Sequence, residues 1–228
     1  MELKELTSNQ LKFIALITMT LDHIGVVLFP HVQWLRIAGR LALPLYAYMI
    51  AEGCRYTRSM GKYLTSMVSL ALVCQIVNYV TMDKSLYQSI LVTFSLSISL
   101  IWLLQTARKK GGILWISLGG LGIATAFFLC QILPKLLPGT DYCIDYGFAG
   151  VMLPVLVYLG KTKPQKLTLF TLGLVALSAT LDQVQWYCLL AAPLMLLYNE
   201  KRGKWKLKWL FYIYYPLHLA AIYGLSLL

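Results

Sequence analysis

Nine apolar segments of near membrane-spanning length follow one another from residue 11 to the end of the chain. A helix needs roughly 20 residues to cross the hydrocarbon core of a bilayer. The composition agrees, because 59% of the 228 residues are hydrophobic, 13% are charged and the mean hydropathy is +0.68. We therefore predict an all-α polytopic integral membrane protein, a single transmembrane domain over residues 1–228 with about nine transmembrane helices (range about 8–10). The segments are 11–29, 35–53, 64–80, 88–106, 112–133, 145–159, 167–180, 184–198 and 209–227.

Lysine and arginine residues alternate strongly between the gaps that separate these segments. When residues at segment ends are counted with the adjoining gap, sixteen lie in the N-terminal region and in every second gap, three lie in the other gaps (Arg36, Lys84 and Lys135), and Arg40 lies inside a segment. Cytoplasmic loops carry the positive excess of membrane proteins. The alternation predicts a cytoplasmic N-terminus, an outside C-terminus and a place in the cytoplasmic (inner) membrane, and it explains the net charge of +11 without a nucleic-acid partner. The segments beside Asp182 are short, so a re-entrant hairpin is an alternative to two spans there.

Four ionisable residues lie deep inside apolar segments, away from the segment ends: Asp22, His23, Arg40 and His218. With the predicted topology and a rise of about 1.5 Å per residue, all four fall in one layer of the bilayer. Ionisable groups at such depth are functional-site candidates. Asp22 and His23 are adjacent and point about 100° apart on a helix, so each must address its own neighbours. The alternative is structural: Asp22 and Arg40 pair to join two helices, and each histidine is a hydrogen-bonded core residue.

Two prolines mark the helices that carry Arg40 and His218. Pro44 follows Arg40 by four residues and predicts a kink inside the second segment. Pro216 precedes His218 by two residues, and Tyr214 is one helical turn before His218 on the same face. A bent helix with a tyrosine and a histidine on one side suits a polar cavity.

Several other chemistries lack their sequence signatures. The three histidines show neither the HxxxH nor the HxxEH spacing, so we expect no metal site. No GxSxG motif is present. The glycine-rich stretch 111–122 follows no strand and indicates close helix packing rather than a phosphate loop.

Four motifs that together span nearly the whole chain resemble the TraX family. They are "LKFIALITMTLDHIG" (11–25), "LRIAGRLALPLYAYMIAEG" (35–53), "LLYNEKRG" (196–203) and "FYIYYPLHL" (211–219). That family is named for a conjugation-system membrane protein that N-acetylates pilin, and it is similar to a larger superfamily of membrane-embedded acyltransferases that use acetyl-CoA. The resemblance implies that His23 is the catalytic residue, with Asp22 beside it. Arg40 matches the "GR" of the second motif, His218 the "PLH" of the last, and Tyr198 and Asn199 the "YN" of the third.

Acyl transfer needs a base for the acceptor and stabilisation of the tetrahedral oxyanion. A histidine suits the first role, which leaves His23 and His218 as alternatives, and Arg40 suits the second role or the binding of an anionic group. We expect acetyl-CoA as donor, docked at the cytoplasmic face on basic loops, although topology alone also explains such loops. The residues expected to bind it are Arg55, Arg58, Lys62, Tyr198, Asn199, Lys201 and Arg202.

The acceptor stays open at this point. It is an amine or hydroxyl of a peptide, a pilin-like protein, a glycan or a small molecule. Two other classes of function are alternatives: a proton- or ion-coupled transporter or channel, and a non-catalytic membrane assembly partner. The lack of a repeat relating two halves of the chain counts against a transporter.

Overall fold

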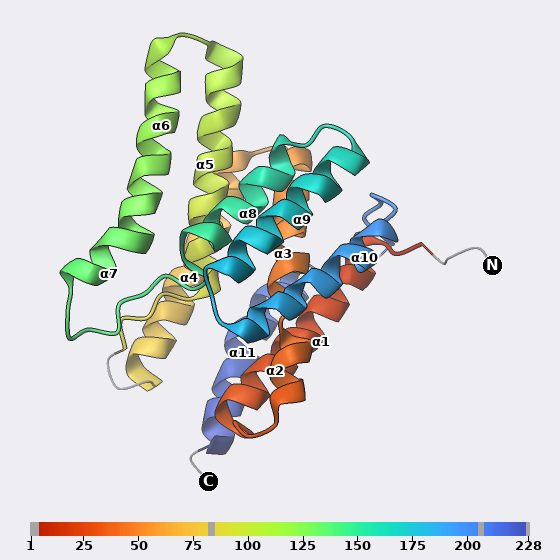
Figure 1. The fold of residues 1–228 in the computed structure, drawn as a ribbon, viewed down its shortest axis with the longest axis vertical. Coiled ribbons are helices and arrows are strands. Elements are labelled where there is room, and N and C mark those ends of the chain that lie inside the picture. The colour runs from red at the N-terminus through yellow and green to blue at the C-terminus, as the bar shows by residue number, and fades with distance from the viewer. Residues whose placement is uncertain (1–4, 82–84, 205–207, 227–228) are drawn as a thin grey trace. The chain divides into compact units, whose positions relative to one another are not determined.

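Every regular element in the described part of the chain is helical (Figure 1). A computed structural model describes residues 5–81, 85–204 and 208–226, so the counted basic residues Lys4, Lys84 and Lys206 lie outside the described residues. The elements are α1 (Ser8–Val27), α2 (Gln33–Gly39), α3 (Ala42–Tyr56), α4 (Met60–Thr81), α5 (Ile90–Lys110), α6 (Ile113–Phe127), the π-helix η1 (Phe128–Ile132), α7 (Leu133–Leu136), α8 (Gly147–Leu159), α9 (Lys163–Ala179), the 3-10 helix η2 (Gln183–Leu190), α10 (Ala191–Leu196) and α11 (Lys208–Ser226).

Helices occupy all nine predicted apolar segments, so the prediction of an all-α chain is confirmed. Among the described residues, four helical stretches are long and apolar enough to cross a membrane: Ser8–Val27, Met60–Val80, Ile90–Lys110 and Ile113–Leu136. The last of these combines α6, η1 and α7. Helix α8 is a shorter apolar helix.

The chain divides into two compact units. The first unit contains residues 1–49 and 163–228, and the second contains residues 50–162. The prediction of a single domain over 1–228 stays a prediction. All four ionisable residues singled out in the apolar segments belong to the first unit.

Helix α1 of the first unit begins with a capping box. The Thr7 backbone N–H donates to Gln10 Oε1 at 2.8 Å, and the Gln10 N–H donates to Thr7 Oγ1 at 3.5 Å. At its other end α1 packs closely on α2, since a Cβ added at Gly25 would lie 2.8 Å from Leu35 Cβ. This close approach brings polar side chains of α1 and α2 within reach of each other.

The second predicted segment is interrupted rather than kinked. Helix α2 ends at Gly39 and α3 begins at Ala42, while Arg40 and Leu41 bond back through 3-10-type turns. Pro44 is the third residue of α3, where a backbone N–H needs no intrahelical partner. The proline therefore sits in the first turn of a new helix, and the break lies beside Arg40 itself.

The region around Asp182 forms a hairpin of α9 with η2 and α10. The arms contact each other along their length: Ser178 Oγ donates to the Gln185 carbonyl at 3.2 Å, and Lys163 Nζ donates to the Leu196 carbonyl at 2.9 Å. A 3-10 helix rises about 2.0 Å per residue, against about 1.5 Å in an α-helix. The shorter returning arm therefore reaches about the same 25 Å as α9, most of the thickness of a hydrocarbon core.

In the second unit the helices bring alternate connections to opposite ends. At one end Gln105 Nε2 donates to the Cys54 carbonyl at 3.2 Å and to the Tyr158 hydroxyl at 2.9 Å. At the other end the Gln88 N–H donates to the Cys143 carbonyl at 2.8 Å. The connections α3–α4, α5–α6 and α8–α9 thus lie at one end, and segments 85–88 and 141–145 lie at the other. Most described basic residues of this unit are in these three connections or in the adjoining helix turns.

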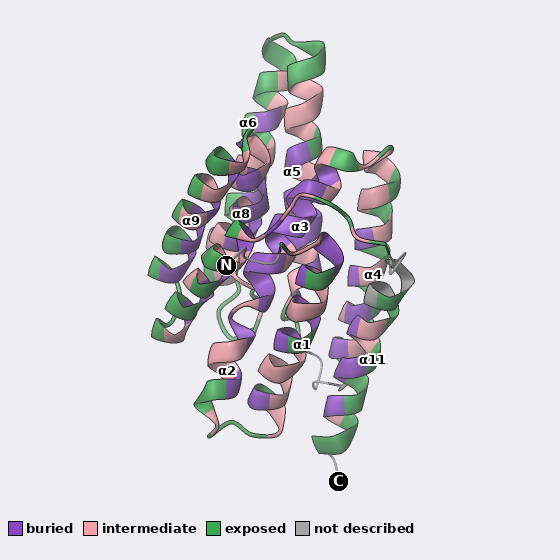
Figure 2. Ribbon diagram, turned by 90° about the vertical axis from the view of Figure 1, so that its right-hand side faces the viewer, coloured by how far each residue is buried: buried purple, intermediate pink, exposed green. Residues whose placement is uncertain are grey.

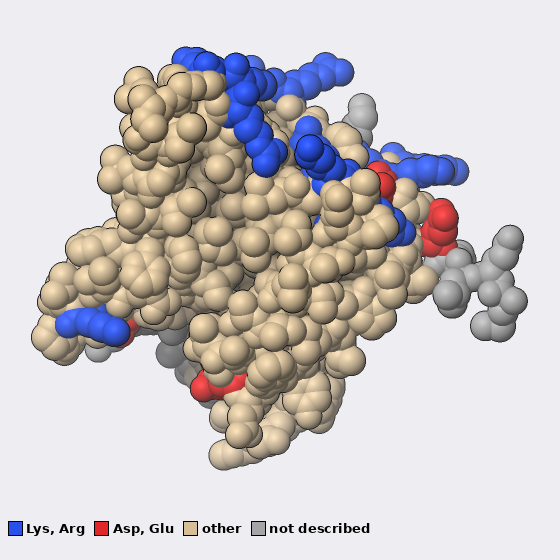
Figure 3. All heavy atoms as spheres, turned by 45° about the horizontal axis from the view of Figure 1, so that its top comes forward, with Lys and Arg blue, Asp and Glu red and all other residues tan. Residues whose placement is uncertain are grey.

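Large apolar side chains are exposed along the flanks of the long helices. Leu72, Ile76 and Val80 of α4 are 59%, 64% and 74% exposed, and Figure 2 shows exposed residues recurring along this helix. Lysine and arginine side chains gather instead at helix ends and connections (Figure 3). Contiguous apolar flanks with charged ends are typical of helices that face lipid.

Candidate functional site

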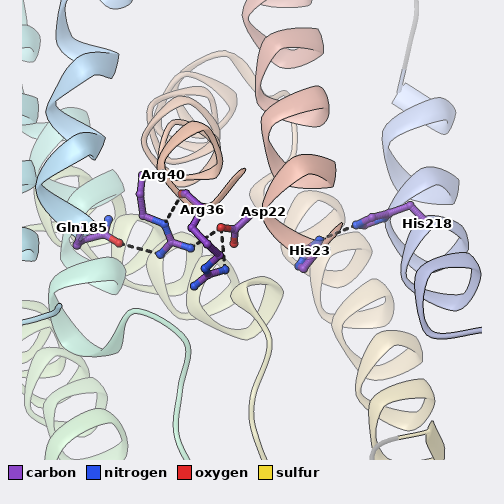
Figure 4. Close-up of polar contacts among 6 residues, drawn as sticks. All are labelled: Asp22, His23, Arg36, Arg40, Gln185 and His218. Atoms are coloured by element: carbon purple, nitrogen blue, oxygen red, sulfur yellow. Dashed lines mark hydrogen bonds and ion pairs between the residues drawn. The ribbon is translucent and has the colours of Figure 1, made fainter. Parts of the chain in front are cut away.

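Two histidines from opposite ends of the chain meet inside the first unit. His23 Nδ1 lies 2.9 Å from His218 Nε2, and the ring centroids are 4.9 Å apart (Figure 4). Their positions are separated by 195 residues in the sequence. The sequence predicted that both residues lie in one layer, and the structure places them in direct hydrogen-bonding contact.

Aromatic residues of α11 surround this histidine pair. The Tyr214 ring stacks on His218 with centroids 5.1 Å apart, which confirms the predicted common face. The Tyr214 hydroxyl lies 2.8 Å from Thr20 Oγ1 of α1. Tyr215 meets both imidazoles edge-on, at 6.4 Å from His23 and 5.4 Å from His218. The pair is therefore held between two helices by stacking and by a second polar contact.

Asp22 forms a separate group on another side of α1. Its Oδ1 accepts from Arg40 Nη2 at 2.6 Å and from Arg36 Nη1 at 2.8 Å. Arg40 Nη1 also donates to Gln185 Oε1 of η2 at 3.0 Å, so the group joins α1, α2 and the hairpin (Figure 4). The structure thus has the pair of Asp22 with Arg40 that the sequence offered as an alternative.

The four predicted residues fall into two groups rather than one cluster. Figure 4 shows Asp22 and His23 pointing to different sides of α1, as their adjacency requires. Sequence reasoning missed Arg36 and Gln185. Arg36 was counted as a gap residue, yet it precedes Arg40 by four positions and therefore shares its helical face. Gln185 is a polar residue at the start of an apolar segment, and this position could have marked it as a candidate from the sequence alone.

Gly39 allows α2 to approach Asp22, and this gives a stability prediction. A Cβ at Gly39 would overlap Cβ and Oδ1 of Asp22. We expect Gly39→Ala to lower the free energy of unfolding by about 1–3 kcal/mol, because the helices or the carboxylate must shift. The measurement is thermal unfolding in detergent. Gly120→Ala in α6, where an added Cβ meets nothing within 4 Å, is the matched control and should be neutral or slightly stabilising. Equal melting temperatures for the two variants would contradict the close approach.

The basic residues predicted to bind acetyl-CoA near α3 and α4 differ in whether their side chains bond to the protein or are exposed. Arg55 Nη2 donates to the carbonyls of Tyr158 and Gly160 at 2.9 and 2.7 Å, at the end of α8. Cations are stabilised by the free carbonyls at a helix C-terminus. Arg55 therefore stabilises the second unit, whereas Arg58 and Lys62 are exposed.

The "YN" motif lies at the start of α1 within the first unit. Tyr198 is buried and packs edge-on against Tyr48 at 5.9 Å. Asn199 Oδ1 accepts from the Lys201 N–H at 3.0 Å, and the carbonyls of Lys201 and Arg202 accept the first N–H groups of α1. Tyr198 and Asn199 thus shape this segment, and the Lys201 and Arg202 side chains stay exposed. Among the described residues no three His, Cys, Asp or Glu side chains group as a metal site would need.

Comparison with known proteins gives a family match over nearly the whole chain. The family model described as TraX protein matches residues 7–226. The probable fimbrial assembly protein FimC of Dichelobacter nodosus (serogroup H1) is 26% identical over 246 residues, covering 96% of this chain and 95% of that protein. An uncharacterised protein of Rickettsia prowazekii (strain Madrid E) is 31% identical over 86 residues, covering 38% of this chain and 33% of that protein. No solved structure matches the chain.

Proposed function

Because the chain belongs to the TraX family, we propose that it is an integral membrane acyltransferase that passes an acetyl group from cytoplasmic acetyl-CoA to an amine or hydroxyl acceptor. The observation that carries the proposal is the contact between His23 and His218 inside the apolar helices of the first unit. Ionisable groups deep inside apolar helices are functional-site candidates. An imidazole is the usual general base of acyl transfer.

The hydrogen bonds of the pair support different roles for the two histidines. A carbonyl only accepts, so the 2.9 Å contact with the Tyr214 carbonyl means that His218 Nδ1 carries a proton. In a neutral pair His218 Nε2 is then an acceptor, and His23 Nδ1–H donates to it. His23 Nε2 is left with its lone pair. His23 is accordingly the base, and His218 is a positioning residue that fixes the tautomer of His23. In the same way, the base of a catalytic triad is oriented by a neighbouring side chain.

The proposed step keeps all atoms in balance. The acceptor nitrogen or oxygen forms a bond to the acetyl carbonyl carbon while its proton passes to His23 Nε2. The carbon–sulfur bond of the thioester then breaks, and the leaving CoA sulfur takes the proton back from His23. Neutral CoA thiol and the acetylated acceptor are the products.

Arg40 fits a positioning role better than direct contact with the oxyanion. Its guanidinium bonds Asp22 and Gln185, on a different side of α1 from His23. By holding α2 and η2 against α1, these bonds fix the helix that carries the base. For the donor, the exposed side chains of Arg58, Lys62, Lys201 and Arg202 suit contacts with phosphate. The acceptor is proposed to be a pilin-like peptide amine, because the matching Dichelobacter protein is named a fimbrial assembly protein.

The experiment is CoA release by purified protein. We expect free thiol to appear with acetyl-CoA and a peptide bearing a free N-terminal amine, and mass spectrometry to find that peptide heavier by one acetyl group. The same peptide with a blocked N-terminus is the control. Folded protein that releases no CoA with peptide, glycan or small-molecule acceptors would point to a non-catalytic assembly partner.

The finer topology is also part of the proposal: nine spans, a cytoplasmic N-terminus, an outside C-terminus and the inner membrane. It is supported by the alternation of basic residues and by their location at one end of the second unit. A native residue makes it testable, because Cys143 is the exposed cysteine and the other four are buried. We expect a membrane-impermeant maleimide to label Cys143 from outside intact spheroplasts.

Although the Cys143 side chain is exposed, partial desolvation by neighbouring groups, and then the Asp145 charge, raise the pKa of its thiol above the ordinary value. Labelling should therefore be slow near pH 7 and accelerate as the pH rises and thiolate forms. Cys143→Ser is the blank, and Lys109→Cys in that background should react only after permeabilisation. Reaction of Lys109→Cys from outside would refute the predicted orientation.

A further inference from the structure

Two guanidinium groups share a single carboxylate in the Asp22 group. Arg36 and Arg40 both bond Asp22 Oδ1, and Asp22 is the one acidic residue between positions 6 and 51. Asp182, three residues before Gln185, is exposed. The group therefore carries an excess positive charge, and charge is expensive in an apolar span unless it is compensated.

The same group has one buried donor, Gln185 Nε2, that lacks a hydrogen-bond partner among the described residues. Gln185 is 2% exposed, and its Oε1 is occupied by Arg40. Its Nε2 is buried and has no hydrogen-bond partner of normal geometry among the described residues, and the Cys188 sulfur, a weak acceptor, lies beside it. A buried donor without an acceptor costs about 1–3 kcal/mol. An incoming acceptor with negative charge would remove that penalty and balance the arginines at once.

Arg36 is the more exposed of the two arginines, and apolar side chains lie near it in the sequence. The Arg36 side chain is 34% exposed and its Cδ lies beside Gly25, near the end of α1. The residues that follow and lead into α2 expose large apolar side chains: Phe29 is 53% and Trp34 62% exposed. Exposed aromatic residues at helix ends are typical of the membrane interface, where lipid phosphates lie.

We propose that Arg36, Arg40 and Gln185 form a binding site for an oxyanion, the phosphate of a lipid headgroup. The planar fork of an arginine matches the geometry of phosphate. Arg36 supplies the accessible contact, and Arg40 and Gln185 supply charge and a buried donor behind it. The apolar rim favours a phosphate that arrives on acyl chains over one that arrives free in water. The site does not depend on acetyl transfer, so its test uses binding alone.

The test is the thermal stability of delipidated protein in an uncharged maltoside detergent, titrated with three probes. They are dioleoyl phosphatidylglycerol, dioleoylglycerol, which has the same chains without phosphate, and inorganic phosphate. We expect phosphatidylglycerol to raise the melting temperature of the wild type and dioleoylglycerol to leave it unchanged. Arg36→Gln should weaken the phosphatidylglycerol response about 10–100-fold in midpoint concentration, since one charge-assisted contact is lost.

Lys135→Gln, an exposed basic residue of α7 on the same predicted side, is the matched control and should respond like the wild type. If Arg36→Gln does not fold, Arg36→Lys keeps the charge without the fork and should weaken the response by a smaller factor. A response to inorganic phosphate alone would support the oxyanion site and refute the lipid source. Equal responses of Arg36→Gln and Lys135→Gln, or none in the wild type, would overturn the site.

Discussion

His23→Ala is expected to lower the rate of acetyl transfer about 10²–10⁴-fold, the usual effect of removing a general base, while the protein stays folded. The imidazole is half-buried beside α11, and its loss removes the lone pair that the His218 contact leaves free. CoA release and thermal unfolding are measured on the same preparation. His31→Ala is the matched control, because His31 is the exposed histidine, and it should keep wild-type turnover.

The variants of His218 separate a base from a residue that positions it. His218→Gln retains an oxygen that can accept from His23 Nδ1–H, so it should keep more turnover than His218→Ala. Both should lose less than His23→Ala, and they should alter the pH profile of the rate because the His23 tautomer is no longer fixed. A near wild-type rate for His23→Ala, with a large loss in His218→Ala, would reverse the two roles.

Asp22→Asn should lower the free energy of unfolding by about 3 kcal/mol, near the lower end for breaking a buried ion pair. The reason is that Arg40 and Arg36 both lose their shared carboxylate oxygen. The Arg40 side chain is 10% exposed and that of Arg36 34%, so Arg40 is the guanidinium that cannot be rehydrated. Arg40→Gln should therefore cost more stability than Arg36→Gln.

The double variant Asp22→Asn with Arg40→Gln decides what the ion pair does. It strands no deeply buried charge, so we expect most of the lost stability to return, together with part of the turnover, because Arg40 only positions α1. Thermal unfolding and CoA release are compared across the two single variants and the double variant. A stable but inactive double variant would show instead that Arg40 contacts the reacting groups, as the sequence alone suggested.

The sequence by itself determined the class of the molecule and predicted a common depth for its polar residues. Hydrophobic runs must be helical in lipid, since every backbone polar group has to be satisfied within the segment, and the described segments are helical. The rise of a helix is fixed, so Asp22, His23, Arg40 and His218 could be assigned to one layer without knowing which helices are neighbours. The family motifs agreed with the family match over residues 7–226.

Only the tertiary structure decided which of these residues touch. Depth along a helix axis is a local property, whereas the partner across the interface depends on rotation and packing that the spacing of apolar residues does not encode. That is why Arg36 was counted with a gap and not expected to reach Asp22, although the close packing of α1 on α2 allows the two side chains to bond. It is also why one predicted layer became two groups: adjacent residues on α1 face different helices, His23 toward α11 and Asp22 toward α2.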